Sequence, residues 1–235
     1  MRNSILASVL FSLVCLFACT PHTEAAQPHV YTLVYLRTGP KNGQLPAAEN
    51  REAMDGHFSN MARLAQEKKL VVAGPFGENN HDKTLEGLFV INSADRAQAT
   101  EWAGTDPGTR AGLFVQDQHD FSTDAPLVAM LERVLAIDAK ALAEGKKRNP
   151  GEGARAYVIL TCDKFEVAQR ELDPLLKSGG VFLLAKVDGS QAFAVLDATN
   201  VADAQKKFAT VIEHIGNCVL DDWYATDQLA HMAEK

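Results

Sequence analysis

The feature that most constrains the fold is an order of segments that occurs twice along the chain. Residues 29–121 follow the order strand, helix, strand, strand, helix, strand, judged from apolar alternation and helical spacing. The same order returns over residues 156–224. Three short matches support the repeat, namely KKLVVAG with GGVFLLA, GLFVINS with AFAVLDA, and INSADRAQA with DATNVADAQ. A repeat of this size indicates two copies of one supersecondary unit.

Each copy predicts a four-stranded antiparallel sheet with both helices on one face. The other face then lacks cover, and a second unit can supply it. We therefore expect an α+β protein in which two tandem ferredoxin-like βαββαβ units pack sheet to sheet as an internal pseudo-dimeric α+β barrel. The units are expected over residues 29–121 and 154–235, with a connecting helix and a linker over residues 122–153. Ser93 and Asp124 are the expected N-caps of the second helix and of the connecting helix.

The first residues of the chain predict export. Arg2 precedes an apolar run from Ile5 to Phe17. This run is too short for a stable transmembrane span, and its flanks are typical of a secretory signal. The simplest interpretation is a cleaved signal that ends near Ala25-Ala26, which would leave a soluble periplasmic or secreted protein.

A second interpretation of the signal comes from its last residues. The run ends in Leu16-Phe17-Ala18-Cys19, which resembles the cleavage box of bacterial lipoproteins. The resemblance implies a signal peptide over residues 1–18, lipidation of Cys19 and a flexible tether over residues 19–28. Because Thr20 rather than Asp follows the cysteine, it also implies an outer-membrane lipoprotein that faces the periplasm.

Composition limits the partners of the chain. The formal net charge is −7, and the sequence has no stripe of Lys and Arg. Because nucleic-acid binding depends on clustered basic residues, we expect no nucleic-acid partner. We expect membrane contact only through the N-terminal lipid. The sequence shows no Cys/His spacing of a zinc site and no phosphate-binding glycine loop, so we expect neither a metal nor a cofactor.

Two cysteines lie beyond the predicted signal. Cys162 and Cys218 both fall in predicted strands of the second unit. In an oxidising compartment two such cysteines can pair. Two buried free thiols are an equally compatible arrangement, so the sequence leaves their pairing open.

The candidate site is an imidazole and a carboxylate that the predicted topology brings to one edge. His57 lies on the apolar face of the first predicted helix, and Asp106 opens a turn after the second. Following the strand directions, the start of helix one, the end of helix two and the end of strand two share this edge. Gly74-Pro75 ends strand two, and Arg37 ends strand one. We therefore expect all of these residues to converge.

Each candidate has a functional role and a structural alternative. An imidazole beside a carboxylate supports proton transfer near neutral pH, with His57 as the base and Asp106 as the group that orients it. Arg37 and Arg110 are candidates for binding an anionic group of a substrate. The alternatives are a core histidine, ordinary Asp-Pro-Gly turn chemistry and solvated arginines. Gly74 and Pro75 are interpreted as a wall of the pocket, where glycine permits close approach.

The same residues carry a resemblance to a known family. The segments GHFSNMARLAQEKKLVVAGPF (residues 56–76) and TDPGTRAGLF (residues 105–114) resemble the YCII-related family. The resemblance covers residues 29–121 and implies a ferredoxin-like dimeric α+β barrel. It also implies an active site at His57 and Asp106. Some members of the family are enzymes of aromatic-compound breakdown, including a dehydrochlorinase.

The second unit departs from the family pattern. Ala168 or Gln169 stands where the first unit has its helix histidine, and Glu213-His214 replaces the Asp-Pro turn. We interpret this unit as a degenerate copy that completes the barrel. The alternative is that Glu213 or His214 contributes a group to a shared cleft.

Three functions are compatible with these observations. The first is a cofactor-independent enzyme that uses the His–Asp pair for proton abstraction or elimination on a small cyclic or carbonyl compound. The second is a non-catalytic cell-envelope module that binds a small ligand. The third is a structural lipoprotein. In each case the chain is expected to form an internal pseudo-dimer.

Overall fold

The computed structural model describes residues 27–146 and 152–232. The predicted signal peptide and the lipidation candidate Cys19 lie outside the described residues, as does part of the predicted linker. Within the described ranges, no helix is both long enough and apolar enough to cross a bilayer.

The first unit contains four strands and three helices. In chain order they are β1 (His29–Thr38), α1 (Ala47–Gln66), β2 (Leu70–Pro75), β3 (Leu85–Ile91), α2 (Arg96–Ala103), α3 (Pro107–Arg110) and β4 (Phe114–Thr123). The connecting helix α4 (Leu127–Ala143) follows. The second unit contains β5 (Ala154–Cys162), α5 (Phe165–Ser178), β6 (Val181–Val187), β7 (Gln191–Leu196), α6 (Val201–Ile215), β8 (Cys218–Thr226) and a short 3-10 turn (Asp227–Leu229).

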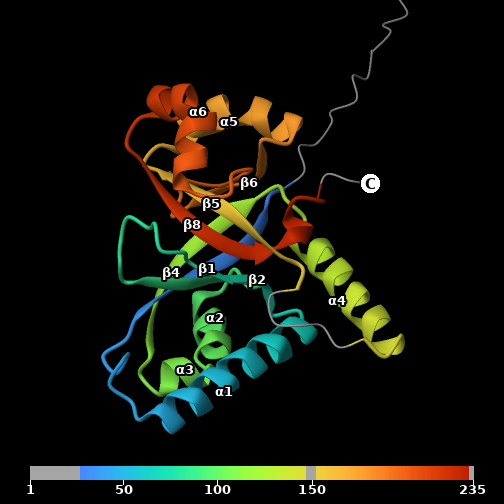
Figure 1. The fold of residues 1–235 in the computed structure, drawn as a ribbon. Coiled ribbons are helices and arrows are strands. Elements are labelled where there is room, and N and C mark those ends of the chain that lie inside the picture. Colours follow the sequence, from blue (N-terminus) through green and yellow to red (C-terminus); the bar gives the residue numbers. More distant parts are fainter. Residues whose placement is uncertain (1–26, 147–151, 233–235) are drawn as a thin grey trace, which may run out of the picture.

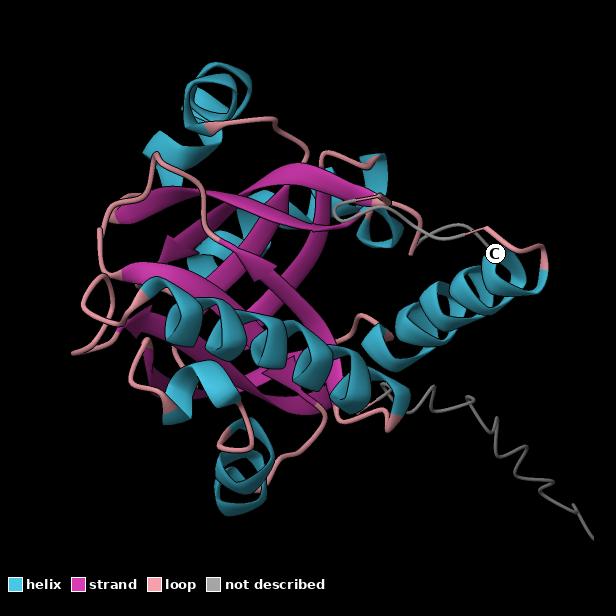
Figure 2. Ribbon diagram, turned by 60° about the horizontal axis from the view of Figure 1, so that its bottom comes forward, coloured by secondary structure: helices cyan, strands magenta, loops and turns pink. Residues whose placement is uncertain are grey.

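All eight strands belong to one antiparallel sheet in the order β2-β3-β1-β4-β6-β7-β5-β8. Each half has its first strand in the same interior position, as a ferredoxin-like unit requires. The halves join where β4 pairs with β6, with Phe121 opposite Val187. At the other seam β2 meets β8 through a bridge between Phe76 and Trp223. The sheet therefore curls into a nearly closed barrel (Figure 1; Figure 2), which confirms the predicted fold class.

The strand pairing of the two units corresponds residue by residue. In the first unit the β2–β3 ladder shifts register after Leu70, and in the second the β6–β7 ladder shifts after Val181. Counting along the ladders from these shifts places Ala185 at the position of Gly74. The family relationship of the second unit, as a degenerate copy of the first, stays a prediction.

Three apolar clusters hold the molecule together. The interior of the barrel contains the largest one, with Phe121, Phe193 and Trp223 almost completely buried. Helices α1 and α2 pack on the outer face of the first half of the sheet, and α5 and α6 pack on the second half (Figure 1). The inner face that each four-stranded sheet leaves uncovered is thus covered by the other unit.

The connecting helix and the helix caps differ in detail from expectation. Asp95, not Ser93, caps α2 by accepting the amide hydrogen of Ala97. Asp124 does not cap α4, which begins after Pro126 without a side-chain cap. In both cases a residue near the predicted one occupies the capping position, because the chain turns later than the local pattern suggests.

The two cysteines of the second unit form a disulfide. Cys162 on β5 lies directly opposite Cys218 on β8, and their Cα atoms are 4.2 Å apart. Only the strand order makes this pairing evident, since the two residues are separated by 56 positions in sequence.

Candidate functional site

The candidate pair forms where α1 crosses the start of α3. Gly56 precedes His57, and a Cβ added to Gly56 would lie 2.9 Å from the ring of Pro107. The bare glycine therefore lets the two helices approach closely. In this arrangement His57 Nδ1 lies 2.9 Å from Asp106 Oδ1. The two residues that the sequence singled out are thus in direct contact.

Asp106 is held by more than the imidazole. It caps α3 and accepts hydrogen bonds from the backbone amides of Gly108 (3.3 Å) and Thr109 (3.1 Å). The hydroxyl of Thr109 donates a further bond of 2.9 Å. Burial raises the pKa of Asp106, but the hydrogen bond and charge of His57, together with the Thr109 donors, outweigh burial and lower it. The group is therefore a carboxylate at neutral pH.

A carboxylate at this position fixes the tautomer of the imidazole. Nδ1 of His57 must carry the hydrogen that it donates to Asp106, and Nε2 then carries the lone pair. Among the described residues Nε2 has no hydrogen-bond partner. The ring packs beside Phe114, Phe58 and Phe89, with centroid distances of 5.1, 5.4 and 5.9 Å. The arrangement is an oriented base with an apolar surrounding.

A second polar cluster lies beside the pair, and no sequence motif predicted it. Asn60 lies one turn after His57 and accepts hydrogen bonds from Arg63 (2.8 Å) and Thr105 (3.0 Å). Its Nδ2 is buried and has no partner within the described residues. Thr105 directly precedes Asp106, so this cluster links α1 to the turn that carries Asp106.

The two candidate arginines are engaged elsewhere. Arg37 binds Asp82 at 2.5 Å and Asp117 at 3.2 Å. Arg110 is exposed, and its Nε donates to the carbonyl of Gly104 at 3.0 Å. The structure gives neither arginine a side-chain contact with His57 or Asp106, although the backbone amide of Arg110 donates to the carbonyl oxygen of Asp106 at 3.0 Å. The side chain of Arg37 reaches loop and strand carboxylates instead of the pair. The role of both arginines in binding an anionic group stays a prediction.

Gly74 and Pro75 line a cavity of about 570 Å³ at the seam between β2 and β8. Met61 of α1, one turn beyond His57, contributes to the same lining, whereas neither member of the pair does. A Cβ on Gly74 would lie 1.8 Å from the carbonyl oxygen of Tyr224. The glycine is thus required by the close approach of β8.

Within the described residues, the second unit has no equivalent of the pair. Ala168 on α5 is fully buried at the position where the sequence comparison expects the histidine. Helix α6 runs without a break to Ile215, whereas the first unit interrupts its second helix before Asp106. The side chain of His214 is 61% exposed and lies 3.6 Å from Glu171. It does not line the cavity at Gly74 and Pro75, so the alternative of a shared cleft receives no support.

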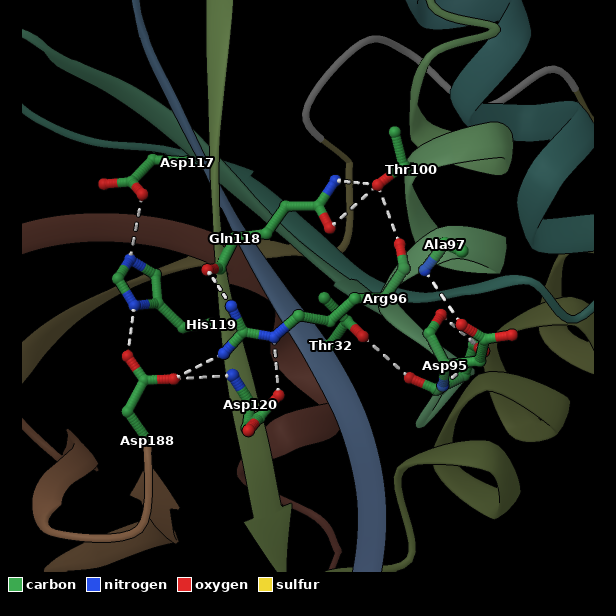
Figure 3. A network of polar contacts seen from close by, with 11 residues as sticks. Thr32, Asp95, Arg96, Ala97, Thr100, Asp117, Gln118, His119, Asp120 and Asp188 are labelled. Carbon is green, nitrogen blue, oxygen red and sulfur yellow. Dashed lines mark hydrogen bonds and ion pairs between the residues drawn. The ribbon is translucent and has the colours of Figure 1, made fainter.

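Other imidazoles bridge the two units. His119 on β4 contacts Asp188 of the β6–β7 turn at 2.7 Å and Asp117 at 3.4 Å (Figure 3). At the opposite seam His81 of the β2–β3 loop contacts Asp221 on β8 at 2.8 Å, so the first unit again supplies the imidazole and the second unit the carboxylate. Because the carboxylate partners of these histidines belong to the other unit, no local sequence pattern indicates the contacts.

Arg96 extends the first of these bridges. It contacts Asp120 at 2.7 Å and Asp188 at 2.9 Å, as Figure 3 shows. In the part of the chain that the structure describes, no group of three or more His, Cys, Asp or Glu residues could hold a metal ion. We interpret the network as an ionic fastening of the β4–β6 seam.

Comparison with known proteins identifies one domain. The family model of the YCII-related domain matches residues 31–118, a segment that contains the whole His57–Asp106 pair. No curated protein and no solved structure matches the chain.

Proposed function

Because residues 31–118 form a YCII-related domain, we propose that this domain is a cofactor-independent enzyme in which His57 is the general base and Asp106 positions it. The reaction is proton abstraction or elimination on a small cyclic or carbonyl compound. The observation that supports this function best is the 2.9 Å contact between Nδ1 and a carboxylate that three further donors hold in place.

The proposed step uses the free nitrogen of the imidazole. Nε2 takes a proton from a carbon next to a carbonyl group or next to a carbon that bears a leaving group. The electron pair of the C–H bond then forms an enolate, or a C=C bond as the leaving group departs with its own pair. The imidazolium keeps its Nδ1–H on Asp106, whose negative charge stabilises it. A base of this kind contributes roughly 10²- to 10⁴-fold to the rate.

Access to Nε2 runs along the edge of the ring. His57 is 6% exposed, and Phe58 beside it is 59% exposed. Phe58 is the most exposed of the three aromatic rings at the site, so we expect substrate to approach His57 on this side. The apolar surrounding suits a compact and largely apolar substrate.

We place this activity in the bacterial cell envelope, with Cys19 as the lipid-bearing residue of an outer-membrane lipoprotein. The disulfide between Cys162 and Cys218 supports an oxidising compartment, since such bonds are rare in the cytosol. The net charge of −7 supports a small-molecule substrate over a nucleic acid.

The test of the proposal follows carbon–hydrogen exchange, which can be detected whatever the product is. The mature protein is incubated in D₂O with a panel of cyclic ketones and chlorinated cyclic compounds, and deuterium incorporation and chloride release are recorded. His57→Gln is expected to lose about 10²- to 10⁴-fold of the rate. His214→Gln, an exposed histidine of the second unit, is the matched control and should retain it.

A readout without substrate tests the base itself. Nitrogen NMR of the histidine rings should show that the neutral imidazole of His57 has its hydrogen on Nδ1 and its lone pair on Nε2. The proposal fails if the tautomer is reversed, or if His57→Gln turns over every active compound at the rate of the folded wild type.

One observation favours a second function, a non-catalytic module that binds a small ligand in the envelope. The cavity at Gly74 and Pro75 is lined by Met61 but by neither residue of the pair. Saturable binding in that cavity without exchange or chloride release, and unchanged in His57→Gln, would support this function instead.

A further inference from the structure

The second unit has its own cavity, at the seam opposite the one that Gly74 lines. It has a volume of about 440 Å³ and lies between α5, β6 and the end of β4. Since β6 corresponds to β2 and α5 to α1, the two cavities occupy equivalent places in the two units. The volume is within the range of small-molecule sites.

The wall of this cavity is apolar with a few polar groups on one side. Phe165, Leu176 and Phe182 contribute apolar surface. Gln169 and Asp173 are one turn apart on α5, so both face the cavity from the same side of the helix. Both side chains are half-buried, and neither has a polar partner among the residues that the structure describes. A carboxylate and an amide are thus available to a ligand.

The positive group of the cavity is already engaged. Lys186 Nζ lies 3.1 Å from Glu166 Oε1 and 4.5 Å above the ring of Phe165. Asp124, at the mouth, adds a second carboxylate without a described partner. The charge that remains uncompensated is therefore negative.

The cavity of the first unit differs in this respect. On the side of helix α1 the cavity is lined by Met61. The charged residue of its described lining is Arg155, which is paired with Asp197. The unit without the imidazole is thus the one whose cavity offers an unpaired carboxylate.

We propose that the second unit contains a binding site for a small amine with an apolar or aromatic body. The ammonium group donates charge-assisted hydrogen bonds to Asp173 and to the amide oxygen of Gln169. The body of the ligand packs against the apolar surface of Phe165, Leu176 and Phe182 that lines the cavity. A carboxylate ligand would instead meet Asp173 and Asp124, two charges of its own sign.

The proposal is tested with three probes of one shape and different charge: 2-phenylethylamine, 2-phenylethanol and phenylacetate. Binding to the mature protein is measured by calorimetry and mapped by NMR. The amine is expected to bind at least about tenfold more tightly than either other probe, and Asp173→Asn should weaken it about tenfold. Asp55→Asn, an exposed change on the corresponding helix α1, should bind the amine like the wild type.

Two further variants keep the outcome clear. If Asp173→Asn is poorly folded, Gln169→Leu provides the second test, with an expected loss of amine affinity. His57→Gln should bind the amine normally, which separates this site from the proposed catalytic pair. The proposal is overturned if phenylacetate binds as tightly as the amine or if Asp173→Asn binds like the wild type. It is also overturned if no amine binds or if the NMR changes map to the Gly74 cavity.

Discussion

The two units build the same ladder and differ where their first helix meets their second. In the first unit α1 presents His57 to Asp106, at a break between α2 and α3. In the second unit α5 presents Ala168, and α6 continues past the corresponding point. A ferredoxin-like unit of this barrel can therefore form without an imidazole–carboxylate pair between its helices.

The comparison bears on why the first unit contains a buried ionisable pair. Removing a carboxylate and an imidazole from water is unfavourable, and a well-packed apolar replacement is often neutral or stabilising. At the position of His57 the second unit has the fully buried Ala168, and its helix α6 runs on without a buried carboxylate facing that position. Architecture alone thus does not require the pair, and this supports a chemical role for it.

The largest expected effect concerns a bond that only the second unit has among the described residues. Replacing both Cys162 and Cys218 by Ser should destabilise the protein by about 4 kcal/mol, since the disulfide closes a loop between residues 56 positions apart. Hydrogen exchange should show the loss in β5 and β8 first. Equal loss of protection in both units would show that the units unfold as one body and would contradict the localised effect.

The next effect isolates the pair by a double-mutant cycle. His57→Leu should cost about 3 kcal/mol in the free energy of unfolding, because it leaves the fully buried Asp106 carboxylate without its imidazole. Combining it with Asp106→Leu, which removes the buried carboxylate as well, should cost less than the sum of the single changes. Urea unfolding of the four proteins measures the coupling, and strict additivity would exclude a direct interaction.

The features that the sequence predicted depend on local pattern and chain direction. Helical spacing and the repeated segment order give the two units, and the strand directions bring His57 and Asp106 to one edge. The features that it missed depend on which strands and loops, far apart in the sequence, become neighbours in the folded chain. Gly74 is required by the backbone of Tyr224, and Cys162 finds its partner only through the strand order. Arg37 is held by Asp82, a loop residue that belongs to no recognisable sequence pattern.

Acid should affect the first unit through Asp106. The pKa of Asp106 is lower in the folded chain than the unfolded value near 3.9. The carboxylate therefore makes its full contribution to the free energy of unfolding above that pH, and this contribution disappears as the pH falls through the folded pKa. Asp106→Asn should therefore be less stable than the wild type by about 2 kcal/mol at pH 7. The difference should shrink below about pH 4. Unfolding by urea across this range checks the trend, with Asp55→Asn as the exposed control; a difference that does not change with pH would contradict it.

The smallest effect is expected at the two seams, where an imidazole of the first unit contacts a carboxylate of the second. His119→Gln removes a contact with Asp188 between partly exposed groups and should cost only about 0.5 kcal/mol. His81→Gln should cost no more, because the backbone amide of His81 still donates to Asp221 at 2.7 Å. Burial raises the pKa of Asp188, but the hydrogen bonds from His119 and from the amide of Asp120, together with nearby positive charges, outweigh burial and lower it. Because this stabilisation is lost as the pH falls through the folded pKa, the effect of His119→Gln should diminish in acid. Thermal unfolding at two pH values measures both variants. A loss of several kcal/mol in either one would mean that the barrel depends on its ionic seams rather than on the apolar interior that the two units share.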